Sequence, residues 1–111
     1  MNINQKDIVL IPYPFSNLEQ KKVRPAIVIS NDNFNRLCSD CIAVPLTSVL
    51  KEEAFSFSIN QTDLQNGKLI KPSRIRLDKI FSVEKRLVHM KIGNVKDDFF
   101  DKLKSELIEI F

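Results

Sequence analysis

Glycine is scarce in this chain, which has only two in 111 residues, Gly67 and Gly93. Phosphate-binding loops and dinucleotide-binding fingerprints need glycines close together in one turn, so both are excluded. Histidine occurs once, which excludes an acid–base pair of two histidines within one chain. An apolar run of about 18 residues is also missing, so no transmembrane helix is expected. The polar start MNINQKDI lacks the apolar region of a secretory signal, and we expect a cytoplasmic protein.

The two cysteines, Cys38 and Cys41, form a single Cys-x-x-Cys pair. A structural zinc ion needs four ligands, and neither a second pair nor a second histidine is available beside His89. A thioredoxin-like redox pair would open a helix after a strand, whereas Cys41 leads into the apolar run CIAVPL. We therefore expect reduced thiols, with Cys41 near the core, and neither a metal ion nor a cofactor. The chain also lacks the G-x-S-x-G motif of α/β-hydrolases and the H-E-x-x-H motif of zinc metalloproteases.

The composition is ordinary for a soluble globular protein, with 43% hydrophobic and 28% charged residues. The length predicts one domain over residues 1–111. The net charge is +3, but its distribution is uneven. Residues 68–91 carry eight basic side chains against Asp78 and Glu84, while residues 92–111 are acidic. A basic middle suits phosphate binding, although charge alone favours the simpler interpretation of solvated strand faces.

Short apolar segments separated by polar ones predict a mainly β chain. A loop is expected over residues 13–23, one or two helical turns over 31–37 with Asn31 or Asp32 as N-cap, and a turn over 61–67. Pro72 suggests an edge strand or a bulge, and Phe55, Phe57 and Ile59 are expected on one strand face. The expected strands cover residues 7–12, 25–30, 41–46, 54–59, 69–77, 79–83 and 87–92.

The last segment changes from strand to helix periodicity. Aspartates at 97, 98 and 101 suit the first turn of a helix, where its dipole favours negative charge. The apolar side chains at helical spacing are Phe99, Phe100, Leu103, Leu107, Ile108 and Phe111. The expected fold class is therefore mainly β (α+β): a small barrel of short antiparallel strands, with a short helix after the second strand. The C-terminal amphipathic helix is expected to cover an open edge or end of the barrel.

Polar residues follow the apolar strands at several points, and their order resembles that of the MazF/PemK (Kid-like) toxins of bacterial toxin–antitoxin systems. The resemblance runs from about Lys6 to the C-terminus. Each motif is common by itself, and the order and spacing together carry the match. The matching pieces are Asp7-Ile8-Val9-Leu10 with Pro12, Arg24-Pro25-Ala26-Ile27-Val28-Ile29-Ser30, Ala43-Val44-Pro45-Leu46-Thr47-Ser48, Ser73-Arg74-Ile75-Arg76-Leu77-Asp78-Lys79-Ile80, and Lys91-Ile92-Gly93.

The resemblance implies a small SH3-like barrel that acts as a homodimer and cuts single-stranded mRNA at short sequences without a metal ion. It places Arg24 and Thr47 at the cleavage positions, and it matches Arg76 and Asp78 to the Arg-x-Asp pair of the Kid-like branch. The chain departs from the family pattern in two places. Lys6 stands where the family usually has glycine, and the loop before Arg24 contains no glycine.

Metal-free RNA cleavage uses the substrate 2′-OH as its nucleophile. An arginine fork matches phosphate oxygens and stabilises the charge that develops on them, so Arg24 is expected to stabilise charge first. Asp78 is a candidate to accept the 2′-OH proton, and Thr47 to donate a hydrogen bond to a phosphate oxygen. The remaining candidates bind RNA, the aromatic ones by stacking on bases: Tyr13, Phe15, Ser48, Lys71, Ser73, Arg74 and Lys79.

Simpler interpretations stay open for these residues. Arg24 can pair with a neighbouring acid, Thr47 and Ser48 can shape a turn, and Arg76 with Asp78 can be a plain salt bridge. Two other functions are open as well. One is a non-enzymatic toxin on the same fold that poisons a protein such as DNA gyrase, as CcdB-like toxins do. The other is an RNA-binding family member with little cleavage activity.

Two partners are expected besides RNA. The resemblance implies a second copy of the chain, and the many apolar residues, among them Phe15, Ile27, Ile29, Ile42 and Val44, are more than a small barrel is expected to cover. The resemblance also implies a cognate antitoxin. Its inhibitory segment is expected to be acidic and partly disordered, because the segment it must block, residues 68–91, is basic.

Overall fold

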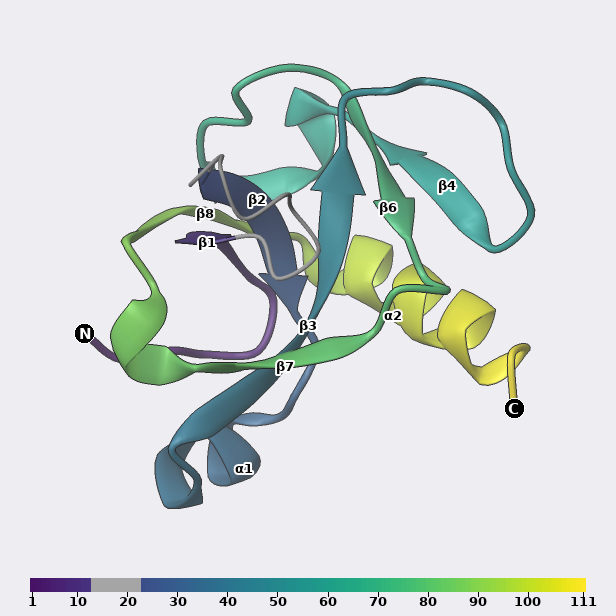
Figure 1. Cartoon of the computed structure of the whole chain (residues 1–111). Coiled ribbons are helices and arrows are strands. Elements are labelled where there is room, and N and C mark those ends of the chain that lie inside the picture. The colour runs from purple at the N-terminus through teal and green to yellow at the C-terminus, as the bar shows by residue number, and fades with distance from the viewer. Residues whose placement is uncertain (13–22) are drawn as a thin grey trace.

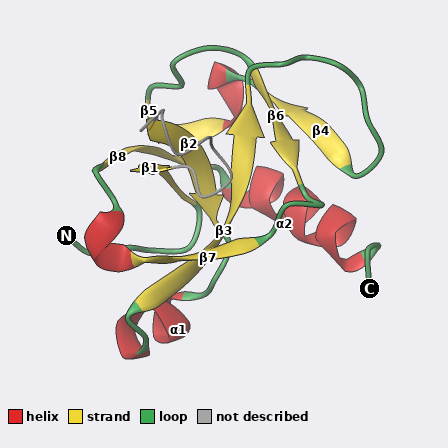
Figure 2. Ribbon diagram, in the orientation of Figure 1, coloured by secondary structure: helices red, strands yellow, loops and turns green. Residues whose placement is uncertain are grey.

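A curled antiparallel sheet forms the body of the molecule (Figures 1 and 2). The computed structural model describes residues 1–12 and 23–111. Within them the strand order is β4-β6-β3-β2-β1-β8-β5, and β7 pairs with the first half of β3. The strands are β1 (Asp7–Pro12), β2 (Val23–Val28), β3 (Asp40–Thr47), β4 (Ser56–Ile59), β5 (Leu64–Gly67), β6 (Ser73–Arg76), β7 (Phe81–Glu84) and β8 (Met90–Val95).

Two α-helices accompany the described strands: α1 (Asp32–Leu37) follows β2, and α2 (Asp97–Ile108) ends the chain. Asn31 caps α1, because its side chain accepts a hydrogen bond from the Phe34 N–H at 2.8 Å. Short 3₁₀ turns at Gln61–Asp63 and Lys85–Leu87 connect strands. None of the helices in the described part of the chain is long and apolar enough to span a membrane.

Apolar residues are buried on both faces of the central strands. On β2, Ile27 packs toward α2, while Ala26 and Val28 pack into a second core on the other face. We call the core between the sheet and α2 the first core and the one on the other face the second core. On β3, Val44 and Leu46 belong to the first core, while Cys41 and Ala43 belong to the second. Burial on both faces explains why these strands read as continuous apolar runs rather than as alternating ones.

The mainly β fold and both predicted helices are confirmed, with several local corrections. Residues 61–67, expected as a turn, contain a 3₁₀ turn and strand β5. Pro72 lies before β6 rather than inside a strand. Phe55 does not share the face of Phe57 and Ile59, because it has a φ of 57° before β4 begins and is half exposed.

The apolar face of α2 is shorter than expected. Phe99, Phe100 and Leu103 are buried, and Leu107 packs at the edge of the core. Ile108 and Phe111 are exposed, at 66% and 87%. The helix lies beside the curled sheet (Figure 1). Its first two turns are buried against the sheet, and its last turn is covered only in part, through Leu107.

Both glycines stand where two strands approach closely. Gly67 on β5 is the partner of Gly93 on β8. A Cβ atom on Gly67 would lie 2.1 Å from the Ile92 carbonyl oxygen, and its φ of +91° is one that side chains disfavour. Both glycines are therefore needed for the close approach of the paired strands β5 and β8.

Lys6 has a positive φ of 81°, although it is not glycine. Its ammonium pairs with Asp97 at 2.8 Å and lies 5.8 Å from the centre of the Phe100 ring. The hydrogen bond to Asp97 raises the pKa of Lys6 above its ordinary value. The position that is usually glycine in the family pattern thus has a glycine-like backbone here, and contacts to α2 stabilise the lysine.

Candidate nucleic-acid site

Arg24, Thr47 and Arg74 lie in a row across three adjacent strands. Thr47, the last residue of β3, is the partner of Arg74 on β6. On the other side of β3, the pairing with β2 ends at Ala26 and Pro45. Arg24 and Thr47 each lie two residues beyond this last pair, so the register, continued along the strands, places them level with each other. Because side chains alternate between faces along a strand, the Thr47 and Arg74 side chains lie on the face opposite buried Leu46 and Ile75. The sheet register therefore brings together three residues that are far apart in the sequence.

Arg76 continues this basic face two residues beyond Arg74. Its Nε and Nη2 donate to the two oxygens of Asp78, at 2.9 and 2.7 Å. Its Nη1 lies 3.3 Å from Oε2 of Glu53. The hydrogen bonds from Arg76 lower the pKa of Asp78 below its ordinary value. Arg76 and Asp78 thus form the salt bridge of the simpler interpretation, and the carboxylate is ionised at neutral pH.

Arg74 is held by the first residue of β4. Its Nη2 donates to the Ser56 carbonyl oxygen at 2.8 Å, and its Nε to Ser56 Oγ at 3.2 Å. The same hydroxyl donates to the Glu53 carbonyl oxygen at 2.8 Å. Sequence reasoning missed Glu53 and Ser56, since they lie outside every motif and only the β4–β6 pairing places them beside the arginines.

A small polar hollow lies among these side chains. Its volume is about 150 Å³. Thr47 and the two arginines of β6 form one side of it, and exposed residues of the β3–β4 connection form the rest. The lining residues are Thr47, Val49, Lys51, Glu53, Arg74 and Arg76. A hollow of this charge and size suits a phosphate group.

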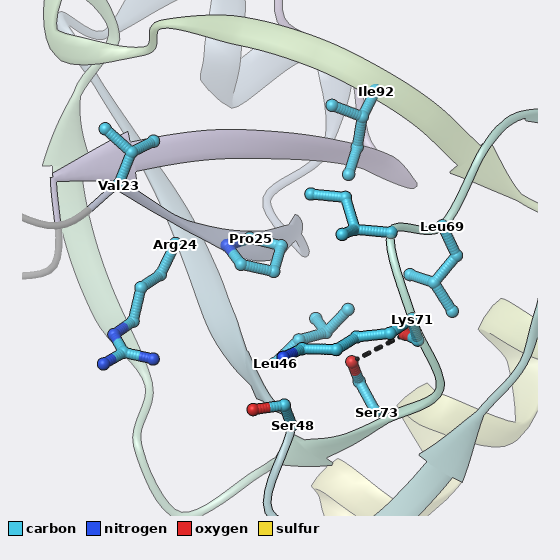
Figure 3. A pocket seen from close by; sticks show the side chains of 10 residues that line it. Val23, Arg24, Pro25, Leu46, Ser48, Leu69, Lys71, Ser73 and Ile92 are labelled. Atoms are coloured by element: carbon cyan, nitrogen blue, oxygen red, sulfur yellow. Dashed lines mark hydrogen bonds between the residues drawn. The ribbon is translucent and has the colours of Figure 1, made fainter.

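A second, more apolar cavity opens on the neighbouring face and has a volume of about 190 Å³ (Figure 3). Its walls are mainly apolar, from Pro25, Leu46, Leu69 and Ile92 among others. It is smaller than the roughly 300–1,000 Å³ pockets that hold drug-sized ligands, so it suits one small flat group. Its polar lining residues are Arg24, Ser48, Lys71 and Ser73.

The polar side chains of this apolar cavity differ in exposure. Ser73 is only 4% exposed, and its hydroxyl donates to the Lys71 carbonyl oxygen at 3.0 Å. Ser48 and Lys71 are exposed, and the Lys71 side chain lies across the cavity toward Leu46 (Figure 3). The structure therefore brings four predicted site residues, Arg24 included, to one cavity.

Other predicted residues lie elsewhere. Lys79 and Asp78 line neither hollow, and predicted Tyr13 and Phe15 fall outside the residues that the structure describes. His89, which has no assigned function, is exposed.

The second half of the basic stretch 68–91 makes several contacts within the chain. Lys85 donates to the Asn35 carbonyl oxygen and Lys91 pairs with buried Asp7 at 3.1 Å. Arg86 pairs with Glu84. Three cations in the second half of this stretch therefore have partners within the chain.

No cluster of three or more histidine, cysteine or acidic side chains that could hold a metal ion occurs within residues 1–12 and 23–111. The two cysteines are free, and Cys41 is fully buried as predicted, while Cys38 is half-buried. Burial raises the pKa of the Cys41 thiol, which keeps it protonated and unreactive.

Comparisons with known proteins agree with this architecture. Endoribonuclease EndoA of Bacillus subtilis (strain 168) is 28% identical over 94 residues, which cover 85% of this chain and 80% of EndoA. A MazE-MazF crystal structure (Form-III) from Deinococcus radiodurans matches with a TM-score of 0.80 at 16% identity, over 99% of this chain and 96% of that one. An endoribonuclease in complex with its cognate antitoxin from Mycobacterial species matches with a TM-score of 0.76 at 17% identity, over 96% and 92% of the two chains.

These solved structures are too distant in sequence to show more than the fold. The family is shown by a family model, described as PemK-like, MazF-like toxin of type II toxin-antitoxin system, which matches residues 4–111. That match includes every residue of the row across β2, β3 and β6, together with both hollows beside it. The chain belongs to the PemK-like, MazF-like toxins of type II toxin–antitoxin systems.

Proposed function

We propose that this chain is a metal-independent endoribonuclease toxin that cleaves single-stranded mRNA at short sequences. The observation that carries the proposal is the row of Arg24, Thr47 and Arg74, with Arg76 beside it. The names of EndoA and of the mycobacterial neighbour, both endoribonucleases, support the same activity.

In the proposed reaction the 2′-OH of one nucleotide attacks the adjacent phosphorus. The O2′–P bond forms and the P–O5′ bond breaks. The leaving O5′ takes a proton from water, so that a 2′,3′-cyclic phosphate and a 5′-hydroxyl result. Arg24 and Arg76 stabilise the negative charge that develops on the non-bridging oxygens, and Thr47 donates a hydrogen bond to one of them. Arg74 binds the phosphate in the polar hollow.

Asp78 is the proposed acceptor of the 2′-OH proton. Both of its oxygens accept hydrogen bonds from Arg76 in the free protein, so RNA must displace one of these bonds before the carboxylate can act. A carboxylate with a lowered pKa is a weaker base, and its second function is to orient the Arg76 guanidinium. Phosphate binding by Arg76 favours this exchange, since the phosphate replaces the carboxylate as a partner.

The remaining predicted residues bind the chain of the RNA. We assign one unpaired base to the apolar cavity, where Ser48, Lys71 and Ser73 supply the polar edge. Lys79 is exposed on the connection after β6 and is assigned to the RNA backbone. Tyr13 and Phe15 are proposed to stack on bases.

Cleavage of a mixed single-stranded RNA in the presence of EDTA tests the proposal. We expect cuts at a short recurring sequence, and none where the 2′-OH of the cut nucleotide is replaced by hydrogen. Arg24→Ala is expected to lower the cleavage rate by about 100-fold or more, and Thr47→Ala to lower it less. The matched control is Arg36→Ala, which removes an exposed arginine of α1.

Intact RNA after incubation with the wild-type protein would refute the enzyme. Binding of that RNA without cleavage would then identify an RNA-binding protein, and inhibition of DNA gyrase would identify a poison of a protein target. Cleavage of the 2′-deoxy substrate would refute the mechanism alone.

A cognate antitoxin is the proposed partner that keeps the toxin inactive, as in the complexes to which two of the structural neighbours belong. Its inhibitory segment is proposed to be acidic and to place carboxylates on Arg24, Arg74 and Arg76 where RNA phosphates would lie. Expression of the chain alone in the cytoplasm is expected to arrest growth, and co-expression of the neighbouring open reading frame to restore it. Harmless expression of an enzyme that cuts RNA in vitro would refute this regulation.

A homodimer is also proposed, although two residues named in its favour do not support it. Ile27 and Val44 are fully buried in the core of the single chain. The exposed apolar residues lie elsewhere and include Val49, Leu50 and Ile70. Sedimentation at micromolar concentration is expected to give twice the 12.8 kDa chain mass, and a clean monomer would refute the dimer.

A further inference from the structure

The turn between β3 and β4 touches both arginines of β6. Glu53 contributes its carboxylate to Arg76, and Ser56 contributes its hydroxyl and its carbonyl oxygen to Arg74. The turn is closed on itself by the bond from Ser56 Oγ to the Glu53 carbonyl oxygen. A single short segment thus contacts two guanidinium groups that lie on the same strand face.

The backbone of this turn is strained. Phe55 has a φ of 57°, a value that a bulky residue rarely adopts. Its carbonyl oxygen accepts a hydrogen bond from the Leu77 N–H at 3.0 Å, and its side chain is half exposed, so burial of the ring does not explain the conformation. Strained residues persist where surrounding contacts hold them, and they are frequent at functional sites.

The β4–β6 register explains how the turn reaches the arginines. Ser56 is the partner of Arg76, and Ser58 is the partner of Arg74. Arg74 therefore reaches diagonally, two residues along β4, to bond with Ser56. This direction carries its guanidinium toward that of Arg76 and toward the polar hollow that both line.

We propose that Glu53 and Ser56 are positioning residues, which hold Arg76 and Arg74 in the orientation that binds the scissile phosphate. The proposal rests on the endoribonuclease function proposed above. Both act through the arginines, although Glu53 also lines the polar hollow. Glu53 holds the edge of Arg76 that Asp78 leaves uncovered, and Ser56 holds Arg74, so both guanidiniums are ordered before the substrate arrives and less ordering is needed on binding.

Glu53→Gln and its neighbour Glu52→Gln form a matched pair. Each removes one negative charge from the same exposed connection, so the pair controls for the change in net charge, while only Glu53 contacts Arg76. With a fluorogenic RNA substrate we expect kcat to fall on the order of tenfold in Glu53→Gln only, through loss of orientation. Equal kcat in the two variants, with the wild type active, would overturn the function of Glu53.

A double-mutant cycle separates positioning from general stabilisation. If Glu53 acts through Arg76, Glu53→Gln is expected to have no further effect on kcat in an Arg76→Ala background. Equal losses of kcat in both backgrounds would overturn the proposal. Thermal unfolding of each variant checks that it is folded.

Ser56→Ala is tested by a measurement that needs no activity. The {¹H}–¹⁵N NOE of the Arg74 Nε–H group reports how well that side chain is ordered, and we expect it to fall toward the value of a mobile side chain in Ser56→Ala. Ser58→Ala is the control, because Ser58 pairs with Arg74 through the backbone and no side-chain bond joins them. An unchanged Arg74 NOE would overturn the function of Ser56. RNA left intact by the wild-type protein would overturn the endoribonuclease and, with it, the positioning function, whatever the NOE shows.

Discussion

Replacing Lys6 by glycine and by alanine measures how much its backbone conformation costs. Lys6 has a φ of 81°. It is held there because its N–H donates to the Val28 carbonyl oxygen and its own carbonyl oxygen accepts from the Val95 N–H, both at 3.0 Å. These two bonds join the start of β1 to β2 and β8, so the residue cannot relax to a negative φ without breaking them. Any residue at this position must therefore adopt the same conformation.

The magnitude follows from three contributions. A side chain at positive φ costs about 1–2 kcal/mol relative to glycine. The ion pair with Asp97, whose side chain is 87% exposed, stabilises by at most about 1 kcal/mol, and the contact with Phe100 by about 0.5–1 kcal/mol. Glycine gains about 0.5–1 kcal/mol of extra conformational entropy in the unfolded chain, which opposes its benefit.

Alanine loses both side-chain contacts and keeps the strain, whereas glycine loses the contacts and removes the strain. We therefore expect Lys6→Ala to lower the free energy of unfolding by about 1 kcal/mol. Lys6→Gly is expected to stay within about 0.5 kcal/mol of the wild type, because relief of strain offsets the lost contacts. The glycine variant is thus the more stable of the two.

Urea unfolding at neutral pH, followed by circular dichroism, gives the two free energies from the midpoint and slope. Exposed Lys104 in α2 provides the control, since glycine in a helix is less stable than alanine by about 1 kcal/mol. The order of the two variants must therefore reverse between positions 6 and 104. An alanine variant more stable than the glycine variant at position 6 would refute the argument.

Three further outcomes are expected. Under native conditions iodoacetamide is expected to label Cys38 and not buried Cys41, as peptide mass spectrometry would show; native labelling of Cys41 would contradict its raised thiol pKa. The lowered pKa of Asp78 stabilises the fold fully above about pH 4 and less as the pH falls through the native pKa. Asp78→Asn is therefore expected to lower the unfolding free energy at neutral pH by less than about 1 kcal/mol, since the pair is exposed. This difference from the wild type is expected to shrink in acid, and a larger difference in acid would contradict the pairing. Gly67→Ala is expected to lower the free energy of unfolding by about 2 kcal/mol or more, because its Cβ would lie 2.1 Å from a carbonyl oxygen. Urea unfolding measures this loss. A variant as stable as the wild type would contradict the close approach of β5 and β8.

Local pattern was sufficient for most of the elements. The run at residues 7–12 is β1 with the predicted bounds, and the helix that begins at Asp97 was predicted from its acidic first turn and helical spacing. Strand β5 was missed because its sequence, LQNG, has turn residues and one buried side chain. Pairing with β8, rather than strand propensity, makes it a strand.

The candidate site, too, could be predicted only in part from the sequence. The motifs identified Arg24, Thr47, Arg76 and Asp78 as residues of interest. The Arg76–Asp78 pair could be predicted because the two residues are only two apart in the sequence, although Asp78 lies in the turn after β6 and not on a strand. The pairing of Thr47 with Arg74 could not, because it depends on the register between β3 and β6. Register is decided by which apolar side chains share a core, and that is a property of the packed chain.

By itself, the sequence determined the secondary structure of the apolar segments, the absence of glycine-rich loops and the motifs that define the family. Only the tertiary structure decided that cations of the second half of the basic stretch pair within the chain, that Lys6 adopts a backbone suited to glycine, and that Glu53 holds Arg76. The physical reason is the separation along the chain over which each effect acts. Propensity and periodicity act within a few residues, whereas ion pairs, close strand crossings and strained backbones form between segments that only the fold brings together.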